Sequence, residues 1–278
     1  MKITKGLIND FVIYLREEEK SKATPEKYLR DVTAFLLWLD GEEADKSKVL
    51  SYKDYLIEKY APASVNSVLS SLNSFFDYCN RYELKVKTLK IQRRIFSDSK
   101  KELTKEEYRK LLVAAKSREN MKLYYLMQTI CSTGIRVSEL RFITLEALKE
   151  GKAEIKNKGK LRVILLPAEL CKILKKYSER QKITSGPVFV TRNRKPLDRS
   201  TIWKMMKSLC EDAGVSPEKV FPHNLRHLFA RTYYSLQKDI VRLADILGHS
   251  NVNTTRIYTM ETGDIHLRNI QKLGLLHT

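Results

Sequence analysis

The stretch His223-Asn224-Leu225-Arg226-His227 decides how the rest of this chain is interpreted. His223 and Arg226 are three residues apart, so on a helix they project from the same face. A guanidinium and an imidazole that point in one direction can bind the oxygens of a phosphate. Taken alone, a His-x-x-Arg pair usually forms an ion pair at the surface, so the interpretation depends on what accompanies it.

Two further pieces follow this stretch. Gly248 can end a helix in the left-handed conformation and present His249 just beyond it. Tyr258 comes nine residues after His249 and supplies a phenol that can act as a covalent nucleophile. Each piece also has an ordinary explanation, because a Leu-Gly-His often ends a helix and most of the 14 tyrosines are expected in the core.

A fourth piece, TGIRVSEL at residues 133–140, supplies a second arginine, Arg136. Glu139 lies three residues further on and can hold the guanidinium of Arg136 in place. All the pieces in this order and spacing are much rarer than any one of them alone. Together they resemble the tyrosine recombinase, or phage integrase, family.

Charge and cysteine usage limit the class of protein. The 278 residues include 52 Lys and Arg against 33 Asp and Glu, a formal net charge of +19, which favours a polyanion partner and nucleic acid first. An anionic membrane surface also fits this charge, but no apolar run approaches the ~20 residues of a spanning helix. The N-terminus does not have the pattern of a signal peptide. The four cysteines contain no Cys-x-x-Cys pair, which favours reduced thiols in the cytoplasm over a zinc site or a disulfide framework.

The first part of the chain predicts a compact bundle of four short helices. Apolar residues recur at helical spacing over residues 7–16, from Thr24-Pro25 to about residue 39, over residues 48–59 and from Pro62 onward. The pattern Thr24…Tyr28…Asp31…Phe35…Trp38, followed by ASVN at residues 63–66, resembles the core-binding domain of the same family. That resemblance implies one half of a clamp around a DNA duplex.

The opposite face of the fourth helix is small and polar. Such residues can approach a DNA backbone closely and bond its phosphates, although a face in contact with solvent looks the same in sequence. A basic segment follows this helix and is expected to follow phosphates. The candidate DNA-binding residues are Lys27, Arg30, Ser64, Asn66, Ser67, Ser70, Ser71, Arg93 and Arg94.

The predicted fold is mainly α with a small antiparallel β-sheet, in two domains. Residues 1–86 form the helical core-binding domain, residues 87–102 a basic linker, and residues 103–278 a mixed α/β tyrosine recombinase catalytic domain. Thr104 with Glu107 has the pattern of a capping box that opens the second domain. A hairpin is expected around residues 157–160, a short strand over residues 187–191 and a helix over about residues 199–213.

The resemblance implies that DNA is cut and rejoined through a 3′-phosphotyrosine. Tyr258 attacks the scissile phosphate, and Arg136 and Arg226 neutralise charge on the phosphorus. His223 assists proton transfer or donates to a phosphate oxygen, and His249 donates to the other non-bridging oxygen. No metal or other cofactor is expected.

A lysine on the hairpin turn is implied to protonate the leaving 5′ oxygen. The common family pattern is Gly-Lys-Gly-x-Lys-x-Arg, and this turn is one residue shorter. Lys158 is therefore preferred, while Lys156 and Lys160 remain alternatives, and a surface lysine is the ordinary explanation for each.

The expected partners are double-stranded DNA recombination sites. A homotetramer acts on two sites, and the protein is a monomer without DNA; accessory DNA-bending factors are left open, and no membrane partner is expected. The preferred function is integration or excision of a mobile element, because the tail lacks a His-Pro-Arg motif and the chain enters its core-binding domain at once. The alternatives are a chromosome-dimer resolvase, a type IB-like nicking-closing enzyme and a non-catalytic DNA-binding protein.

The last residues predict a short helix with an apolar stripe. After Gly263-Asp264, apolar residues recur every three positions, at Leu267, Ile270, Leu273 and Leu276. A helix this short is marginal in water, so the stripe needs a groove. Packing on its own domain is one option, and the resemblance favours the other, in which the exchange tail from about residue 263 enters a neighbouring protomer.

Overall fold

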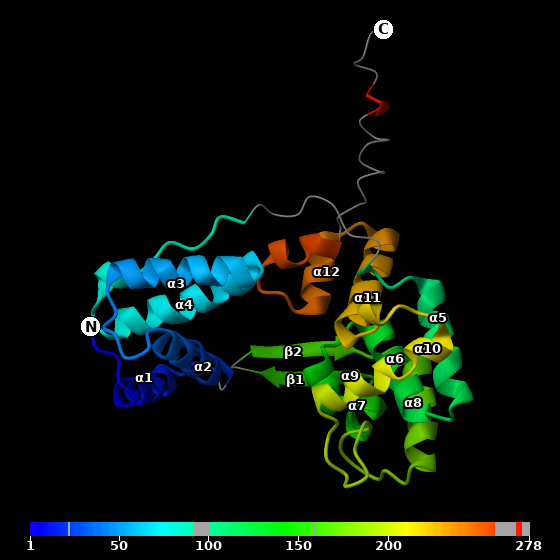
Figure 1. Cartoon of the computed structure of the whole chain (residues 1–278). Helices are drawn as coiled ribbons and strands as arrows, with labels where there is room; N and C mark the ends of the chain where they lie inside the picture. Colours follow the sequence, from blue (N-terminus) through cyan, green and yellow to red (C-terminus); the bar gives the residue numbers. More distant parts are fainter. Residues whose placement is uncertain (22, 92–100, 158–159, 259–270, 274–278) are drawn as a thin grey trace. The chain divides into compact units, whose positions relative to one another are not determined.

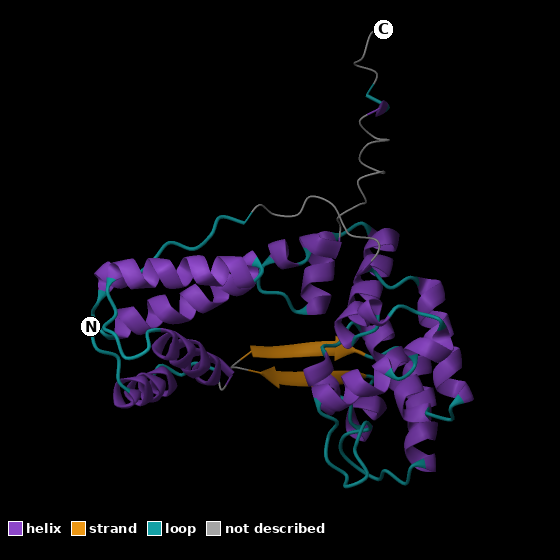
Figure 2. Cartoon of the chain, in the orientation of Figure 1, coloured by secondary structure: helices purple, strands orange, loops and turns teal. Residues whose placement is uncertain are grey.

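The computed structural model describes residues 1–21, 23–91, 101–157, 160–258 and 271–273 (Figure 1). The chain divides into two compact units, Met1–Arg93 and Arg94–Thr278. This division falls within the linker expected at residues 87–102, and the bounds of that linker stay a prediction. Figure 2 shows that helices dominate the described residues and that one pair of strands accompanies them. None of the described helices is long and apolar enough to cross a membrane.

The first unit is the helical bundle that the sequence predicts. Its core is aromatic: Phe11, Phe35, Phe75 and Phe76 are fully buried, and the rings of Phe11 and Phe75 meet edge to face with 5.3 Å between their centroids. The described elements are α1 (Lys5–Glu17), α2 (Ala23–Trp38), α3 (Lys46–Lys59), α4 (Pro62–Tyr78) and the 3₁₀-helix η1 (Tyr82–Leu84). The second helix begins at Ala23, slightly earlier than the Thr24-Pro25 signal predicts.

The second unit is built from helices and one antiparallel hairpin. The strands pair with Asn157 opposite Lys160, which confirms the predicted hairpin. The capping box at the start of the first helix is present, with reciprocal bonds between Thr104 and Glu107. The described elements are α5 (Lys105–Ser117), α6 (Met121–Thr133), η3 (Val137–Phe142), α7 (Leu145–Glu150), β1 (Lys152–Asn157), β2 (Lys160–Leu165), α8 (Ala168–Arg180), α9 (Arg199–Lys207), α10 (Cys210–Ala213), η4 (Pro217–Lys219), α11 (Pro222–Gln237), α12 (Ile240–Leu247), η5 (Val252–Thr254) and η6 (Arg256–Tyr258).

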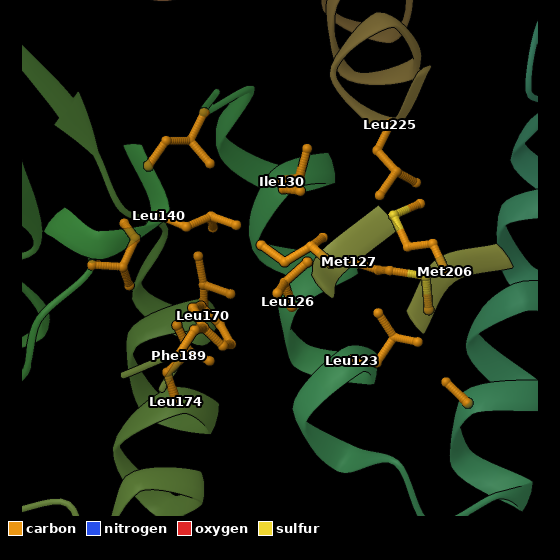
Figure 3. Close-up of a cluster of buried hydrophobic side chains, with 14 of the residues drawn as sticks. Leu123, Leu126, Met127, Ile130, Leu140, Leu170, Leu174, Phe189, Met206 and Leu225 are labelled. Carbon is orange, nitrogen blue, oxygen red and sulfur yellow. The ribbon is translucent and has the colours of Figure 1, made fainter. Parts of the chain in front are cut away.

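Helix α6 is the centre of the second core. Figure 3 shows its side chains Met127 and Ile130 among those of the surrounding helices, including Leu170 of α8 and Leu225 of α11. All four of these side chains are at most 4% exposed. Because α6 is enclosed on several sides, its C-terminal end is held rigidly, and this end leads directly into Gly134 and Arg136.

Two elements differ from the expectation. Residues 187–191 do not form a strand; they make isolated bridges, in which Pro187 pairs with Thr144 and Val190 with Pro196. The helix expected over residues 199–213 is broken into α9 and α10. The fold class itself, mainly helical with a small antiparallel sheet, is as predicted.

Candidate active site

The site is assembled at the C-terminal end of α12. Gly248 ends this helix with φ +63°, the left-handed conformation that the sequence predicts. The carbonyls of three successive residues there accept bonds from three different arginines. Arg162 donates to Ile246 (2.8 Å), Arg226 to Leu247 (2.7 Å) and Arg136 to Gly248 (3.1 Å). Since the carbonyl end of a helix carries partial negative charge, it is a natural anchor for guanidinium groups.

Arg226 is a buried cation. It extends from α11, is 3% exposed, and also donates to the carbonyl of Gly134. Burial, reinforced by the charge of Arg136, lowers the pKa of Arg226 to about 10, so the group stays charged at neutral pH. A buried charge that is bonded mainly to neutral carbonyls favours an incoming anion, because burial of an ion is costly unless a counter-charge is supplied.

Arg136 shares a carboxylate with Arg162. Glu139 is 3% exposed, and its oxygens accept from the backbone and the side chain of Arg136, both at 3.0 Å. Arg162 donates to the same carboxylate, at 3.2 Å to Oε2. The side chain of Arg136 is 39% exposed, so this arginine faces outward while Glu139 and Arg162 lie behind it. The contact between Arg136 and Glu139 is the one that the spacing suggests.

His249 lies between Arg226 and Thr255. Its Nε2 is 3.1 Å from Nη2 of Arg226, and its Nδ1 is 2.8 Å from Oγ1 of Thr255. A guanidinium has only donors, so Nε2 accepts, and the proton of a neutral ring is on Nδ1, which donates to the threonine. Burial, followed by the charges of Arg226 and Arg136, lowers the pKa of His249 to about 4, which keeps the ring neutral. Donation from Nε2 to a phosphate oxygen, as the sequence suggests, requires the other tautomer.

Tyr258 packs against two histidines. It is 4% exposed, and its ring stacks on that of His249 with 6.1 Å between centroids. It also meets the ring of His227 edge to face, with 4.7 Å between centroids. The backbone nitrogen of Tyr258 donates to the carbonyl of Thr255 at 3.0 Å. The ring of Tyr258 therefore lies against His249, which contacts Arg226, although 32 residues separate Tyr258 from Arg226 in the sequence.

His223 occupies the first turn of α11, one turn before His227. The two rings are 4.4 Å apart between centroids. Desolvation, followed by the charge of Arg226, lowers the pKa of His223. Burial also lowers the pKa of His227 to about 4, and its Nε2 is buried without a hydrogen bond in the described structure. Both rings are therefore neutral at physiological pH.

Sequence reasoning missed Arg162, His227 and Thr255. A signal for Arg162 exists in the alternation of β2, where Leu161 and Val163 are exposed while Ile164 is buried. Arg162 is two residues before Ile164, so both side chains point to the buried face of β2, and the alternation predicts a buried charge at position 162. His227 is four residues after His223, so it shares a helix face with it. No periodicity singles out Thr255.

The lysine expected on the hairpin turn cannot be placed. Lys158 lies outside the described residues, and so do the side chains of Lys156 and Lys160. The choice among the three stays a prediction. Among the side chains that the structure does describe, no group of three or more His, Cys, Asp or Glu is placed to hold a metal ion.

The candidate DNA-binding residues of the first unit separate into two sets. Ser71 is fully buried and donates to Asp31, so it is not open to a phosphate, and this part of the prediction is wrong. Lys27 is bonded to the same serine and to Asp31. The side-chain amide of Asn66 accepts from the backbone nitrogen of Leu89 at 2.7 Å and donates to its carbonyl at 2.9 Å. The exposed candidates are Arg30, Ser64, Ser67 and Ser70, while Arg93 and Arg94 lie outside the described residues.

Comparison with known proteins follows the same division of the chain. Residues 101–263 match the phage integrase family, and residues 8–82 match the phage integrase N-terminal SAM-like domain. The chain belongs to the phage integrase family. This confirms the resemblance seen in the sequence, and it makes the chain a tyrosine-type, site-specific DNA recombinase.

Known members of the family align with most of this chain. It is 31% identical to tyrosine recombinase XerA of Pyrococcus furiosus, over 97% of this chain and 94% of the relative. It is also 31% identical to tyrosine recombinase XerD of Xanthomonas campestris pv. campestris, over 88% of this chain and 84% of the relative. A crystal structure of a lambda integrase tetramer bound to a Holliday junction has the same fold, with a TM-score of 0.73 at 20% identity over 94% of this chain and 80% of the other.

Proposed function

We propose that Tyr258 is the nucleophile of this recombinase and forms a 3′-phosphotyrosine with the scissile strand. The observation that supports this most directly is the ring of Tyr258 stacked on His249, whose Nε2 is 3.1 Å from the buried guanidinium of Arg226. A phosphate that bound to Arg226 would lie beside the phenol. Attack forms the phosphorus–oxygen bond to Tyr258 and breaks the bond to the 5′ oxygen, which keeps the energy of the phosphodiester in the new ester.

Arg136 and Arg226 bind the scissile phosphate in this proposal. Both are permanent cations, and each is fixed by carbonyls of α12 before DNA arrives. Such preorganised donors stabilise the charge that develops on pentacoordinate phosphorus, because they need no reorganisation during the reaction. Glu139 positions Arg136 from behind and does not touch the phosphate.

The histidines and a lysine handle protons. His223, at the start of α11, assists proton transfer from the phenol or donates to a phosphate oxygen. His249 supplies the remaining bond to the phosphate when its proton is on Nε2, and the hydroxyl of Thr255 can partner Nδ1 in either tautomer because it both donates and accepts. Lys158 protonates the departing 5′ oxygen, with Lys156 and Lys160 as the alternatives.

Double-stranded DNA is the substrate, and we propose a homotetramer that joins two recombination sites. A net charge of +19 supports a nucleic-acid partner, and the related fold of lambda integrase exists as a tetramer on a Holliday junction. The exposed residues Arg30, Ser64, Ser67 and Ser70 of the first unit, with Arg93 and Arg94, are proposed to bind phosphates. Mobile-element integration or excision is the preferred role, and chromosome-dimer resolution is the alternative.

Covalent trapping tests the nucleophile. The wild-type protein is incubated with nicked genomic DNA from around its gene, and the adducts are sequenced to map the attachment site. Tyr258→Phe removes only the hydroxyl, so it should retain affinity for a synthetic duplex of the mapped site and form no adduct. Tyr234→Phe removes a hydroxyl from α11, is the matched control and should form adducts at the normal rate. Adducts from the Tyr258→Phe protein would assign the nucleophile to another residue.

A further inference from the structure

Arg162 is the buried arginine to which the proposed mechanism gives no role. Its side chain is 12% exposed, against 39% for Arg136, and it lines the same cavity as Arg136 and His249. It comes from β2, whereas Arg136 follows α6 and Arg226 lies on α11. The burial of an arginine has to be offset by bonds that a smaller apolar residue would not need, so the contacts of Arg162 indicate what it does.

Two of its contacts lead directly to Arg136. One amino group of Arg162 donates to Glu139 at 3.2 Å, and the other donates to the carbonyl of Ile246 at 2.8 Å. Glu139 is also the carboxylate that holds Arg136, and Ile246 is two residues before Gly248, whose carbonyl holds the other amino group of Arg136. Arg162 therefore bridges both supports of Arg136 from behind.

Gly248 leaves room for this bridge. A Cβ at position 248 would lie 2.4 Å from Cδ and 2.7 Å from Nε of Arg162. Any side chain there would displace Arg162, so the glycine is required for the close approach as well as for its positive φ. The stem of Arg162 thus packs directly on the backbone that presents His249.

The charges around Glu139 indicate what this bridge does. Glu139 is nearly fully buried and would be an unpaired carboxylate if Arg136 turned toward DNA. Arg162 supplies a second cation to it, so that Arg136 does not have to satisfy Glu139 alone. Without Arg162, the carboxylate would draw the guanidinium of Arg136 inward and cancel the charge that a phosphate needs.

We propose that Arg162 is a positioning residue of the cleavage reaction: it neutralises Glu139 and fastens the end of α12, and through these contacts it directs the guanidinium of Arg136 at the scissile phosphate. This rests on the proposed function, in which Arg136 binds that phosphate. In this role Arg162 acts through Arg136 and needs no contact of its own with the DNA.

The test compares two substrates that differ in charge. One synthetic duplex carries an ordinary scissile phosphodiester, and the other carries a methylphosphonate, in which a methyl group replaces a charged non-bridging oxygen. Arg162→Met should bind both duplexes normally and form adducts on the phosphodiester about 100-fold more slowly than wild type, because a misplaced catalytic group loses about that much. The methylphosphonate is neutral, so the reaction depends less on the charge of Arg136. The deficit in the rate of adduct formation should therefore be smaller by about tenfold or more on this substrate.

Control variants separate this role from a general loss of stability. Arg141→Met removes an exposed arginine of the same unit and should leave both rates unchanged. If Arg162→Met does not fold, Arg162→Lys is judged by the same criterion, since a single ammonium cannot reproduce the two-headed bridge. Equal rates for variant and wild type, or equal deficits on both substrates, would overturn the proposal. A wild-type protein that forms no adduct at all would instead overturn the proposed function.

Discussion

Thr255 connects Tyr258, the proposed nucleophile, to His249, which is proposed to bind the phosphate. It is fully buried, its hydroxyl is 2.8 Å from Nδ1 of His249, and its carbonyl accepts from the backbone nitrogen of Tyr258. Thr255→Val keeps the shape and the backbone bond but leaves Nδ1 of His249 without its partner. We expect cleavage to slow by about tenfold, the equivalent of one lost hydrogen bond, with unchanged affinity for the duplex.

Rescue by serine makes this prediction specific to the hydroxyl. Thr255→Ser restores the donor and acceptor while it removes a methyl group, so it should cleave at close to the wild-type rate. The measurement is the single-turnover rate of adduct formation at saturating protein. If the valine variant cleaves normally, or if serine is as slow as valine, the hydroxyl does not act through His249.

The residues that sequence could identify are those with a recognisable spacing. Arg136, His223, Arg226, His249 and Tyr258 all lie in quoted motifs, and the structure brings them together. Thr255 and the bridge made by Arg162 depend on segments that meet only in three dimensions. The tautomer of His249 was likewise beyond sequence, because it follows from the donor-only guanidinium that happens to face Nε2.

At the scale of elements, the turn after α6 packs closely against α11 and α12. Gly134 has φ +63°, and a Cβ there would lie 2.5 Å from Cδ1 of Phe229 on α11 and 3.0 Å from Leu247 on α12. The carbonyl of Gly134 also accepts from Arg226. Gly134→Ala should lower the free energy of unfolding by about 2 to 4 kcal/mol, because overpacking is added to the strain of a positive φ.

Gly151 is the matched control for Gly134. It ends α7 with φ +72°, and nothing lies within 4 Å of the Cβ that an alanine would add. Gly151→Ala should therefore cost only about 1 kcal/mol, the strain of the left-handed conformation alone. Denaturant unfolding of both variants checks the difference. Equal losses of stability in the two variants would show that α11 and α12 move away from position 134 without a cost in free energy.

Element boundaries show where local signals fail. The helices of the first unit follow the apolar periodicity closely, since each buries one face in the bundle. Residues 187–191 have the composition of a strand, but their neighbours offer only isolated bridges at Thr144 and Pro196, so tertiary context overrides the propensity. The sequence predicts that the polar face of α4 is open to DNA or to solvent, yet Asn66 and Asn73 use their amides to hold the backbone of Leu89 and Val86.

At the scale of the whole molecule, the second unit has a groove without a described occupant. It measures about 360 Å³ and is lined by residues of α5 and α11, among them Tyr108, Phe229 and Leu236. Leu236 is 75% exposed. The stripe of the expected tail lies largely outside the described residues, but Leu273 belongs to it and is 63% exposed. We propose that the exchange tail of a neighbouring protomer, from about residue 263 onward, occupies this groove.

Complementation between two defective proteins distinguishes exchange from packing within one chain. Leu236→Glu places a charge in the groove and leaves the tail intact, whereas a protein that ends at Gly263 keeps the groove and lacks the tail. Each protein alone should bind one position of the mapped site with normal affinity and fail to fill two positions cooperatively. The Leu236→Glu protein fails because desolvating a charge in an apolar groove is costly, and the truncated protein fails because it has no tail. A mixture should recover the two-protomer complex in gel-shift experiments, since the intact tail of one protein can enter the intact groove of the other. Val113→Glu, at an exposed position of α5 outside the groove, should assemble as wild type does. If the mixture recovers nothing, the tail packs on its own unit, because then neither protein holds a working pair of tail and groove.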